Sequence, residues 1–303
     1  GVSSTLVHHL LTSAFDWEGS QEHCEIGAAR LEGFKPFAGM ALPVLYHHTR
    51  WDKLMEMSVA PRPAWQANLI LLCDRVDALM TPYYAENQVL GHVSEIREQV
   101  AKRRGSYFSP VLVDLFLEAS ASEAFWLMLE PRSLHNHLRD MIEFRPDHRI
   151  GIPELRQLAE IFAQIVDAKS PFTAEHSLGV AGVAGFLARR LGVSPENTEK
   201  LELAGLLHDL GKLRVPDEIL DKPGKLDPEE RLVINTHSFE TYQLLRNLPG
   251  FEEIARWAAY HHEEPGGNGY PFHLKGESLP LEARILRVAD IFQAMVQNRP
   301  YRS

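Results

Sequence analysis

The stretch from Glu154 to Ala168, ELRQLAEIFAQIVDA, decides the fold class. Its apolar residues recur at steps of three and four, which places them on one face of an α-helix. They are Leu155, Leu158, Ile161, Phe162, Ile165 and Val166. The segment from Thr173 to Leu191 repeats this spacing, and the sequence lacks the alternating β-branched runs that are typical of strands. The sequence therefore predicts an all-α protein.

Residues that begin helices support this interpretation. Ser194 and Asp227 each precede a proline, as expected for an N-cap residue followed by proline at the first helical position. Glu230 stands three residues after Asp227 and completes the pattern of a capping box. Glycines in the helix predicted after Thr173 permit close contact with neighbouring helices. They are Gly179, Gly182 and Gly185.

The composition bounds the class of protein. A chain of 303 residues corresponds to about two domains. The formal charge of −10 argues against binding to polymeric nucleic acid, and no apolar run is long enough to span a membrane. Two cysteines cannot form a disulfide framework, so we expect a reducing, cytoplasmic location. The chain starts at Gly1 without a methionine, and we expect sequence to be missing at both ends.

A break in helical periodicity marks a domain boundary. The stretch from Phe144 to Pro153 contains two prolines, a glycine and several charges. Such a segment favours a linker over a helix. We therefore predict one domain over residues 1–148 and a second over residues 149–303.

The two halves repeat one pattern of residues. Each has a histidine, then a pair of adjacent histidines, then an aspartate. These are His23, His47, His48 and Asp74 in the first half and His237, His261, His262 and Asp290 in the second. The first histidine precedes the pair by 24 residues in both halves, and the aspartate follows the pair by 26 and 28 residues. This agreement indicates a duplicated domain, and the alternative is chance in a histidine-rich helical protein.

The second half holds a set of residues suited to metal binding. Potential ligands lie on successive predicted helices, which could meet in a bundle. They are His176, His208, Asp209, His237, His261, His262 and Asp290. Imidazole and carboxylate groups suit divalent transition metals. Seven such groups are more than one ion requires. Two ions about 3.5–4 Å apart, bridged by Asp209, would suit phosphodiester hydrolysis. Taken singly, each histidine could instead be an ordinary core residue.

Three motifs in this half resemble a known family. The run His208-Asp209-Leu210-Gly211-Lys212 resembles the signature of the HD phosphohydrolase superfamily. His261-His262-Glu263, followed by Gly267-Asn268-Gly269-Tyr270-Pro271, resembles the signature of its HD-GYP subfamily, and Asp290 with Arg299-Pro300-Tyr301-Arg302 resembles the closing motif. The resemblance extends from about Pro171 to the end. Members of this subfamily are bacterial phosphodiesterases that linearise cyclic di-GMP, and some prefer 3′,3′-cyclic GMP–AMP.

The resemblance implies roles for individual residues. The seven histidines and aspartates named above would be ligands of two divalent transition metals, such as iron or manganese. Asp209 and Lys212 would be catalytic, with Lys212 contacting the scissile phosphate. Arg299 and Arg302 match positions that contact substrate phosphate. Tyr270 would either shape its glycine-containing loop or touch the substrate.

The sequence departs from the subfamily pattern at a few positions. Phe172 stands where some members have a glutamate that binds a third metal, which favours two metals here. Gln293 and Asn298 replace common aspartates, and Gly266 replaces a polar residue before the loop glycine. These changes leave the ligand set intact and concern substrate preference.

The first half lacks parts of the same pattern. It has no Gly-Tyr-Pro loop and no His-Asp-x-Gly-Lys run, so it lacks a bridging carboxylate and a catalytic lysine. We predict a degenerate HD-GYP-like domain with a structural, regulatory or dimer-forming role. The alternative is that partial metal binding survives there. The remaining histidines His8, His9, His135 and His137 are expected to be exposed polar residues.

The leading prediction is therefore a cytoplasmic, metal-dependent phosphodiesterase that hydrolyses cyclic di-GMP or 3′,3′-cyclic GMP–AMP to the linear dinucleotide. Its partner would be the cyclic dinucleotide, not polymeric nucleic acid or a membrane, and a homodimer is possible. One alternative is an HD hydrolase acting on nucleotides or another phosphoester. Another is a catalytically silent module that senses a cyclic dinucleotide or binds a protein.

Overall fold

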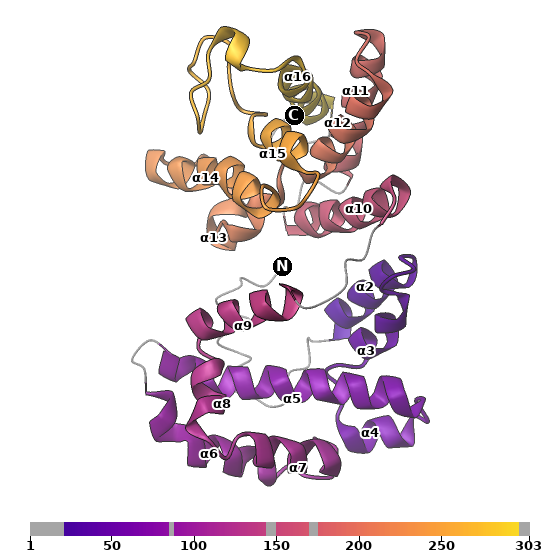
Figure 1. The fold of residues 1–303 in the computed structure, drawn as a ribbon, viewed down its shortest axis with the longest axis vertical. Coiled ribbons are helices and arrows are strands. Elements are labelled where there is room, and N and C mark those ends of the chain that lie inside the picture. Colours follow the sequence, from indigo (N-terminus) through magenta and orange to yellow (C-terminus); the bar gives the residue numbers. More distant parts are fainter. Residues whose placement is uncertain (1–20, 85–87, 144–149, 170–174, 297–303) are drawn as a thin grey trace. The chain divides into compact units, whose positions relative to one another are not determined.

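The structure is a computed structural model that describes residues 21–84, 88–143, 150–169 and 175–296. Within these ranges the elements are α-helices and short 3-10 helices, and no β-strand is present (Figure 1). The prediction of an all-α protein is confirmed.

The chain divides into two compact units, with the division between residues 149 and 150. The described residues up to 143 belong to the first unit, and those from 150 onward belong to the second. Most of the predicted boundary segment lies outside the described residues. That the first unit is a degenerate copy of the second stays a prediction.

The described part of the first unit consists of helices α2 to α9 and one 3-10 helix, η1. They are α2 (Gln21–Glu32), η1 (Ala38–Met40), α3 (Ala41–Leu45), α4 (Trp51–Glu56), α5 (Pro61–Tyr84), α6 (Val89–Ala101), α7 (Pro110–Ala119), α8 (Glu123–Met128) and α9 (Pro131–Glu143). Phe108 and Trp126 are the largest buried side chains of its core, which α5, α6 and α7 enclose. His135 and His137 are exposed on α9, as expected. His8 and His9 lie outside the described residues.

The second unit consists of helices α10 to α16 with two 3-10 helices. They are α10 (Ile152–Lys169), α11 (His176–Arg190), α12 (Pro195–Leu207), η2 (Leu210–Arg214), α13 (Asp217–Leu220), α14 (Pro228–Leu245), α15 (Glu252–Ala259), η3 (Gly276–Ser278) and α16 (Leu281–Val296). Helix α12 packs against α10, α11, α15 and α16. Its residues Leu201, Leu203 and Leu206 are almost fully buried. This central helix leads the chain into the middle of the unit.

The predicted helix starts are confirmed at two positions. The Ser194 hydroxyl accepts a hydrogen bond from the Asn197 amide at 3.2 Å. Asp227 and Glu230 form a capping box, in which each side chain accepts from the other's backbone amide at 2.9 Å. These bonds satisfy amides that lack partners within the helix. Thr173, where a helix was expected to begin, lies outside the described residues.

The buried face of α10 differs from the prediction. Phe162 and Ile165 were placed on the core face, but they are 39% and 36% exposed. Val166 is buried as predicted, but the other buried apolar positions are Ala159 and Ala163. Their small side chains let α10 pack against α11 and α12. The size of the apolar side chains alone did not identify the face of α10 that packs against the core.

Two of the three predicted glycine contacts occur between helices. A Cβ at Gly179 would stand 2.2 Å from the Gln293 side chain of α16, and one at Gly185 would stand 2.0 Å from the Glu202 side chain of α12. A Cβ at Gly182 would meet no described atom within 4 Å. Gly182 is therefore not a helix-contact residue, contrary to the prediction.

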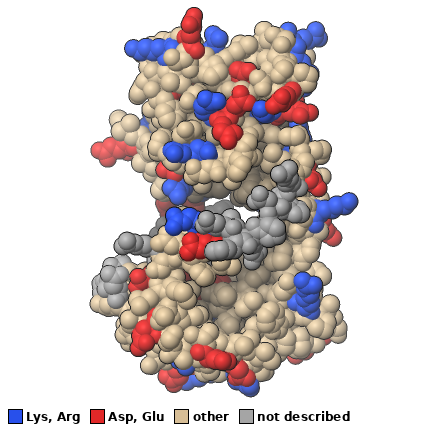
Figure 2. Space-filling model, in the orientation of Figure 1, with Lys and Arg blue, Asp and Glu red and all other residues tan. Residues whose placement is uncertain are grey.

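Two further features concern the surface charge and the helix lengths. On the face drawn in Figure 2, basic side chains are interspersed with acidic ones. Among the described helices, none combines the length and the apolar character that crossing a membrane requires.

Candidate metal centre

The structure brings all seven predicted ligands of the second unit together. His176 begins α11, and His208 and Asp209 link α12 to η2. The remaining four lie in or directly after later helices: His237 in α14, His261 and His262 after α15, and Asp290 in α16. Their ligating atoms form overlapping groups within 4.8 Å, namely His176 with His208 and Asp290, His208 with Asp209 and His261, and His237 with His261 and His262.

Asp209 stands between these groups and contacts both sides. Its Oδ2 lies 3.3 Å from His208 Nε2, and its Oδ1 lies 3.4 Å from His237 Nε2. On one side Asp290 Oδ1 is 3.2 Å from His176 Nε2. On the other side the Nε2 atoms of His237 and His261 are 3.3 Å apart. The carboxylate of Asp209 is thus placed to bridge two positions.

Backbone carbonyls orient three of the histidine rings. The Nδ1 atoms of His208, His237 and His261 lie 2.7, 2.6 and 2.6 Å from the carbonyl oxygen of the residue three positions earlier. Each Nδ1–H therefore donates to the backbone, and each Nε2 faces the centre. Such bonds fix the orientation of histidine ligands in metal sites.

Burial and charge set the protonation of the centre. Burial lowers the pKa of His237 to about 4 and that of His262 to about 3, which keeps these rings neutral. Burial also lowers the pKa of His208, but the Asp209 and Asp290 carboxylates outweigh it and raise the pKa to about 9. The two carboxylates therefore favour a positive charge at this position, and a bound divalent cation would provide one.

One unsatisfied atom shows that the residues fit a metal. His208 Nε2 is buried and forms no hydrogen bond among the described residues, although the carboxylates of Asp209 and Asp290 stand 3.3 and 3.9 Å away. A buried nitrogen without a partner costs free energy, and this one faces other ligand atoms. Imidazole nitrogens and carboxylate oxygens are donors that divalent transition metals accept.

Lys212 and Tyr270 lie at the edge of the centre. Lys212 Nζ donates to Asp209 Oδ2 at 2.6 Å, and its side chain is 22% exposed. The Tyr270 ring stacks on His262 with centroids 4.8 Å apart. Burial raises the pKa of Tyr270, so its hydroxyl stays protonated. Both side chains can contact a ligand that reaches the histidines.

The loop around Tyr270 is held against the histidine pair. Gly267 has a φ of +81°, which favours glycine. A Cβ at Gly269 would stand 2.4 Å from Glu263 Cα, so only glycine fits there. The fully buried Glu263 carboxylate accepts hydrogen bonds from the amides of Phe272 at 2.6 Å and Leu274 at 2.9 Å. A glycine and a buried acid thus fix the loop.

Sequence reasoning missed two positioning residues. Glu263 was quoted in a motif but given no role. Asp167, which is 4% exposed, accepts from Ser177 through the backbone amide at 3.1 Å and the hydroxyl at 2.9 Å. It thereby anchors the start of α11 beside His176. A carboxylate directly after Val166 on an apolar face was the available signal.

Several predicted positions cannot be placed. Arg299 and Arg302 lie outside the described residues, as do Phe172 and Asn298. Gln293 is described, and its amide packs against Gly179 of α11. The roles expected for the two arginines stay predictions.

The first unit brings part of its predicted set together. His23, His47 and His48 form a group with Cys24, whose ligand atoms lie within 4.8 Å of one another. Asp74 is not part of this group and forms an ion pair with the buried Arg75.

Comparisons with known proteins identify the family of the chain. A family model described as HD domain matches residues 160–303. The 3′3′-cGAMP-specific phosphodiesterase 1 of Vibrio cholerae is 38% identical over all of this chain and 71% of its own length. The cyclic di-GMP phosphodiesterase response regulator RpfG of Xanthomonas campestris is 40% identical over 48% of this chain and 39% of its own length.

A solved structure gives the same result. The crystal structure of the cyclic GMP-AMP specific phosphodiesterase V-cGAP3 of V. cholerae matches all of this chain and 74% of that chain, with a TM-score of 0.60 and 26% identity. HD domains depend on divalent metals, and the histidines and aspartates of the second unit form groups that could hold such ions. The chain belongs to the HD-GYP family of cyclic-dinucleotide phosphodiesterases within the HD superfamily.

Proposed function

We propose that this chain hydrolyses 3′,3′-cyclic GMP–AMP to the linear dinucleotide at a centre of two divalent metal ions. The observation that carries the two-ion proposal is the position of Asp209, whose two oxygens face His208 and His237. The substrate preference is supported by the V. cholerae cGAMP-specific relative, which matches both units, whereas the Xanthomonas cyclic di-GMP relative matches 48% of the chain.

The ligands divide into two sets that share Asp209. One ion would be held by His176, His208 and Asp290, and the other by His237, His261 and His262. No thiolate is among them, so iron, manganese and similar ions fit better than soft metals. When bound, the two ions supply Lewis acidity and lower the pKa of a coordinated water.

The protein's own groups bind and orient the phosphodiester. Lys212 donates one N–H to Asp209, and an ammonium has three, so others can reach a non-bridging phosphate oxygen. Tyr270, held by its stack on His262, stands where it can donate its hydroxyl proton to the substrate. We expect Arg299 and Arg302 to bind further phosphate oxygens. Hydrolysis adds one water, breaks one P–O3′ bond and leaves a 3′-hydroxyl and a 5′-phosphate.

The test is a hydrolysis assay on the full chain loaded anaerobically with Mn²⁺ or Fe²⁺. Cyclic di-GMP and 3′,3′-cyclic GMP–AMP are followed in parallel by chromatography, with His208→Ala as the inactive variant. Faster cleavage of cyclic GMP–AMP, lost in the variant, supports the proposal. Equal or faster cleavage of cyclic di-GMP contradicts the substrate preference.

Binding without cleavage would support the alternative of a silent sensor. This requires protein shown to contain two metals, because a poorly loaded centre would be inactive for a trivial reason. The homodimer and the cytoplasmic location stay predictions.

A further inference from the structure

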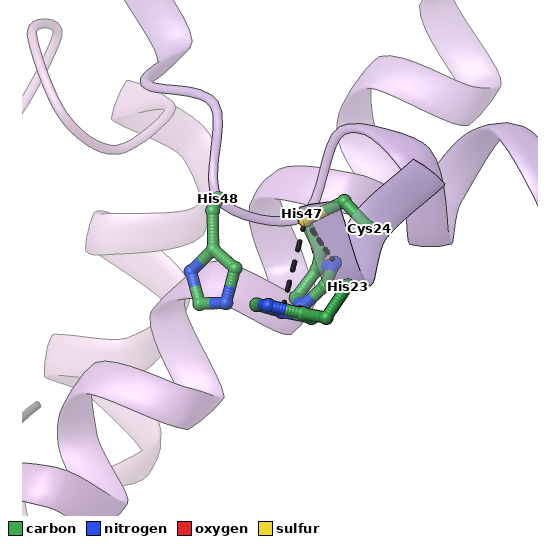
Figure 3. A group of neighbouring side chains, drawn as sticks. All are labelled: His23, Cys24, His47 and His48. Atoms are coloured by element: carbon green, nitrogen blue, oxygen red, sulfur yellow. Dashed lines mark hydrogen bonds between the residues drawn. The ribbon is translucent and has the colours of Figure 1, made fainter. Parts of the chain in front are cut away.

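Four side chains of the first unit form a compact cluster of nitrogen and sulfur atoms. His23 and Cys24 come from α2, and His47 and His48 follow α3 (Figure 3). One ligand atom from each lies within 4.8 Å of the other three. Cys24 is fully buried, whereas His23 is exposed. The cluster therefore has the sulfur at its base and is open to solvent on the side of His23.

The three histidines reproduce one half of the centre in the second unit. The Nε2 atoms of His23 and His47 are 3.3 Å apart, and those of His237 and His261 are also 3.3 Å apart. The His23 and His48 rings have centroids 4.9 Å apart at an angle of 82°. The corresponding rings of His237 and His262 are 5.1 Å apart at 82°. The geometry of a three-histidine site is thus retained.

The orientation of His47 is fixed in the same way as that of a proposed ligand. Its Nδ1 lies 2.6 Å from the Val44 carbonyl oxygen, three residues earlier. His261 Nδ1 is 2.6 Å from the Ala258 carbonyl oxygen in the second unit. The backbone therefore directs Nε2 of His47 toward His23.

The fourth member of the cluster is what distinguishes the two units. Ser238 follows His237, and its hydroxyl lies 3.4 Å from His237 Nε2. Cys24 follows His23, and its Sγ lies 3.7 Å from His23 Nε2. A thiolate binds transition metals far more strongly than a hydroxyl. The first unit thus has a soft sulfur ligand, which becomes anionic when it loses its proton to a metal, where the second has a neutral alcohol.

The carboxylate that matches Asp290 is engaged elsewhere. Asp74, the counterpart of Asp290, accepts two hydrogen bonds at its Oδ2 from Nε and a terminal nitrogen of Arg75, whose side chain is 6% exposed. Within the described part of the first unit, no further group of three potential ligands accompanies the cluster. The site is therefore suited to one ion.

We propose that the first unit binds a single transition-metal ion of the zinc class through His23, Cys24, His47 and His48. Tetrahedral zinc with its usual bond lengths separates two nitrogens by about 3.4 Å and a nitrogen from a sulfur by about 3.6 Å. The observed separations are 3.3 Å for His23 and His47 and 3.7 Å for His23 and Cys24. Four protein ligands close the coordination sphere, as in structural sites, and the ion ties α2 to the segment after α3.

The test uses Co²⁺ as a spectroscopic probe of the full chain in the presence of a phosphine reductant. A thiolate bound to Co²⁺ gives an intense near-ultraviolet charge-transfer band. The chain has two cysteines, Cys24 and Cys73, and both lie in the first unit. The centre of the second unit contains no cysteine, so the band reports the first unit alone. We expect the band in the wild-type protein and its loss on addition of Zn²⁺.

Matched variants assign the band to its residue. Cys24→Ser, which copies the residue at position 238, should abolish it, whereas Cys73→Ser should retain it. The double variant His47→Ala/His48→Ala should lose one equivalent of zinc per chain, and His135→Ala, exposed in the same unit, should lose none. Circular dichroism establishes that each variant is folded.

Two results would overturn the proposal: no charge-transfer band in wild-type protein, or a band of equal strength in Cys24→Ser. The first needs no variant, so a folding defect cannot obscure it. Neither result bears on hydrolysis, since the ligands proposed for catalysis lie in the second unit. The two proposals therefore fail separately.

Discussion

The two units hold the same three-histidine arrangement and differ in what surrounds it. In the second unit Asp209 joins the histidines to His208, and Lys212 donates to Asp209. In the first unit the neighbouring ligand is the sulfur of Cys24, and Asp74 is paired with Arg75. Helix geometry alone can thus assemble imidazoles around a point. Chemistry at a phosphodiester further requires a bridging carboxylate and a nearby cation.

The largest expected effect comes from removing the bridge. Asp209→Asn keeps the shape of the side chain but removes the charge that both sets of ligands share. We expect kcat/KM for the cyclic dinucleotide to fall by about 10³-fold or more, with loss of bound metal. Metal analysis and chromatography of products measure both effects. Full turnover with unchanged metal content would show that the second unit does not depend on a bridging carboxylate.

The next effect concerns Lys212, the cation that donates to Asp209 in the second unit. Lys212→Met should lower kcat by about 10²-fold, the typical cost of losing one donor to developing charge. Metal content should stay the same, because Lys212 is not among the ligand groups. Arg214→Ala, at an exposed position of η2, is the control and should retain activity. A rise in KM alone, without a fall in kcat, would show that Lys212 only binds the ground-state substrate and would contradict its role in stabilising developing charge.

A third prediction compares two glycines of the second unit. Gly269→Ala places a methyl group 2.4 Å from Glu263 Cα and should destabilise the unit by about 1–3 kcal/mol. Gly182→Ala meets no described atom within 4 Å and should stabilise α11 by about 0.5–1 kcal/mol. Urea unfolding followed by circular dichroism measures both changes. Opposite shifts are expected, and shifts of the same sign would contradict this account of the loop.

The smallest effect is the dependence of stability on pH in protein stripped of metal. Burial lowers the pKa of His237 to about 4. Between about pH 6.5 and pH 4, this histidine is therefore protonated in the unfolded chain but neutral in the folded chain. Its contribution to stability is present above that window and is lost as the pH falls through it. His208, with a pKa raised to about 9, contributes fully below about pH 6.5 and loses its contribution as the pH rises toward 9.

We therefore expect the metal-stripped protein to lose on the order of 1 kcal/mol per buried neutral histidine between pH 6.5 and 4.5. Urea titrations at the two pH values measure this change. His237→Gln, which cannot titrate, should reduce the loss. An equal loss in the variant would show that His237 is not neutral in the folded state.

The sequence predicted what depends on periodicity and on spacing along one chain. Ser194 and Asp227 cap helices as expected because the capping bonds are local. The convergence of His176 with Asp290 was expected only through the family resemblance and the order of the helices. Distances between elements depend on packing, which no local pattern encodes.

Packing also explains what the sequence did not predict. Phe162 is exposed because the small side chains of Ala159 and Ala163, rather than the bulky ones, face the neighbouring helices. Glu263 received no role because its partners are backbone amides, which every residue has. Cys24 received none because its proximity to His47 arises from the packing of α2 against α3.

The hydrogen bonds from His208, His237 and His261 to backbone carbonyls determine whether the metal site is ordered before an ion binds. Because these rings are oriented by the backbone, their conformational entropy is lost when the helices form rather than when an ion arrives. The site is thus preorganised, and its affinity rests on the integrity of helix ends rather than on induced ordering. Chelation of the metals should consequently leave the helical content of this unit intact, unlike in zinc fingers, which unfold without their ion.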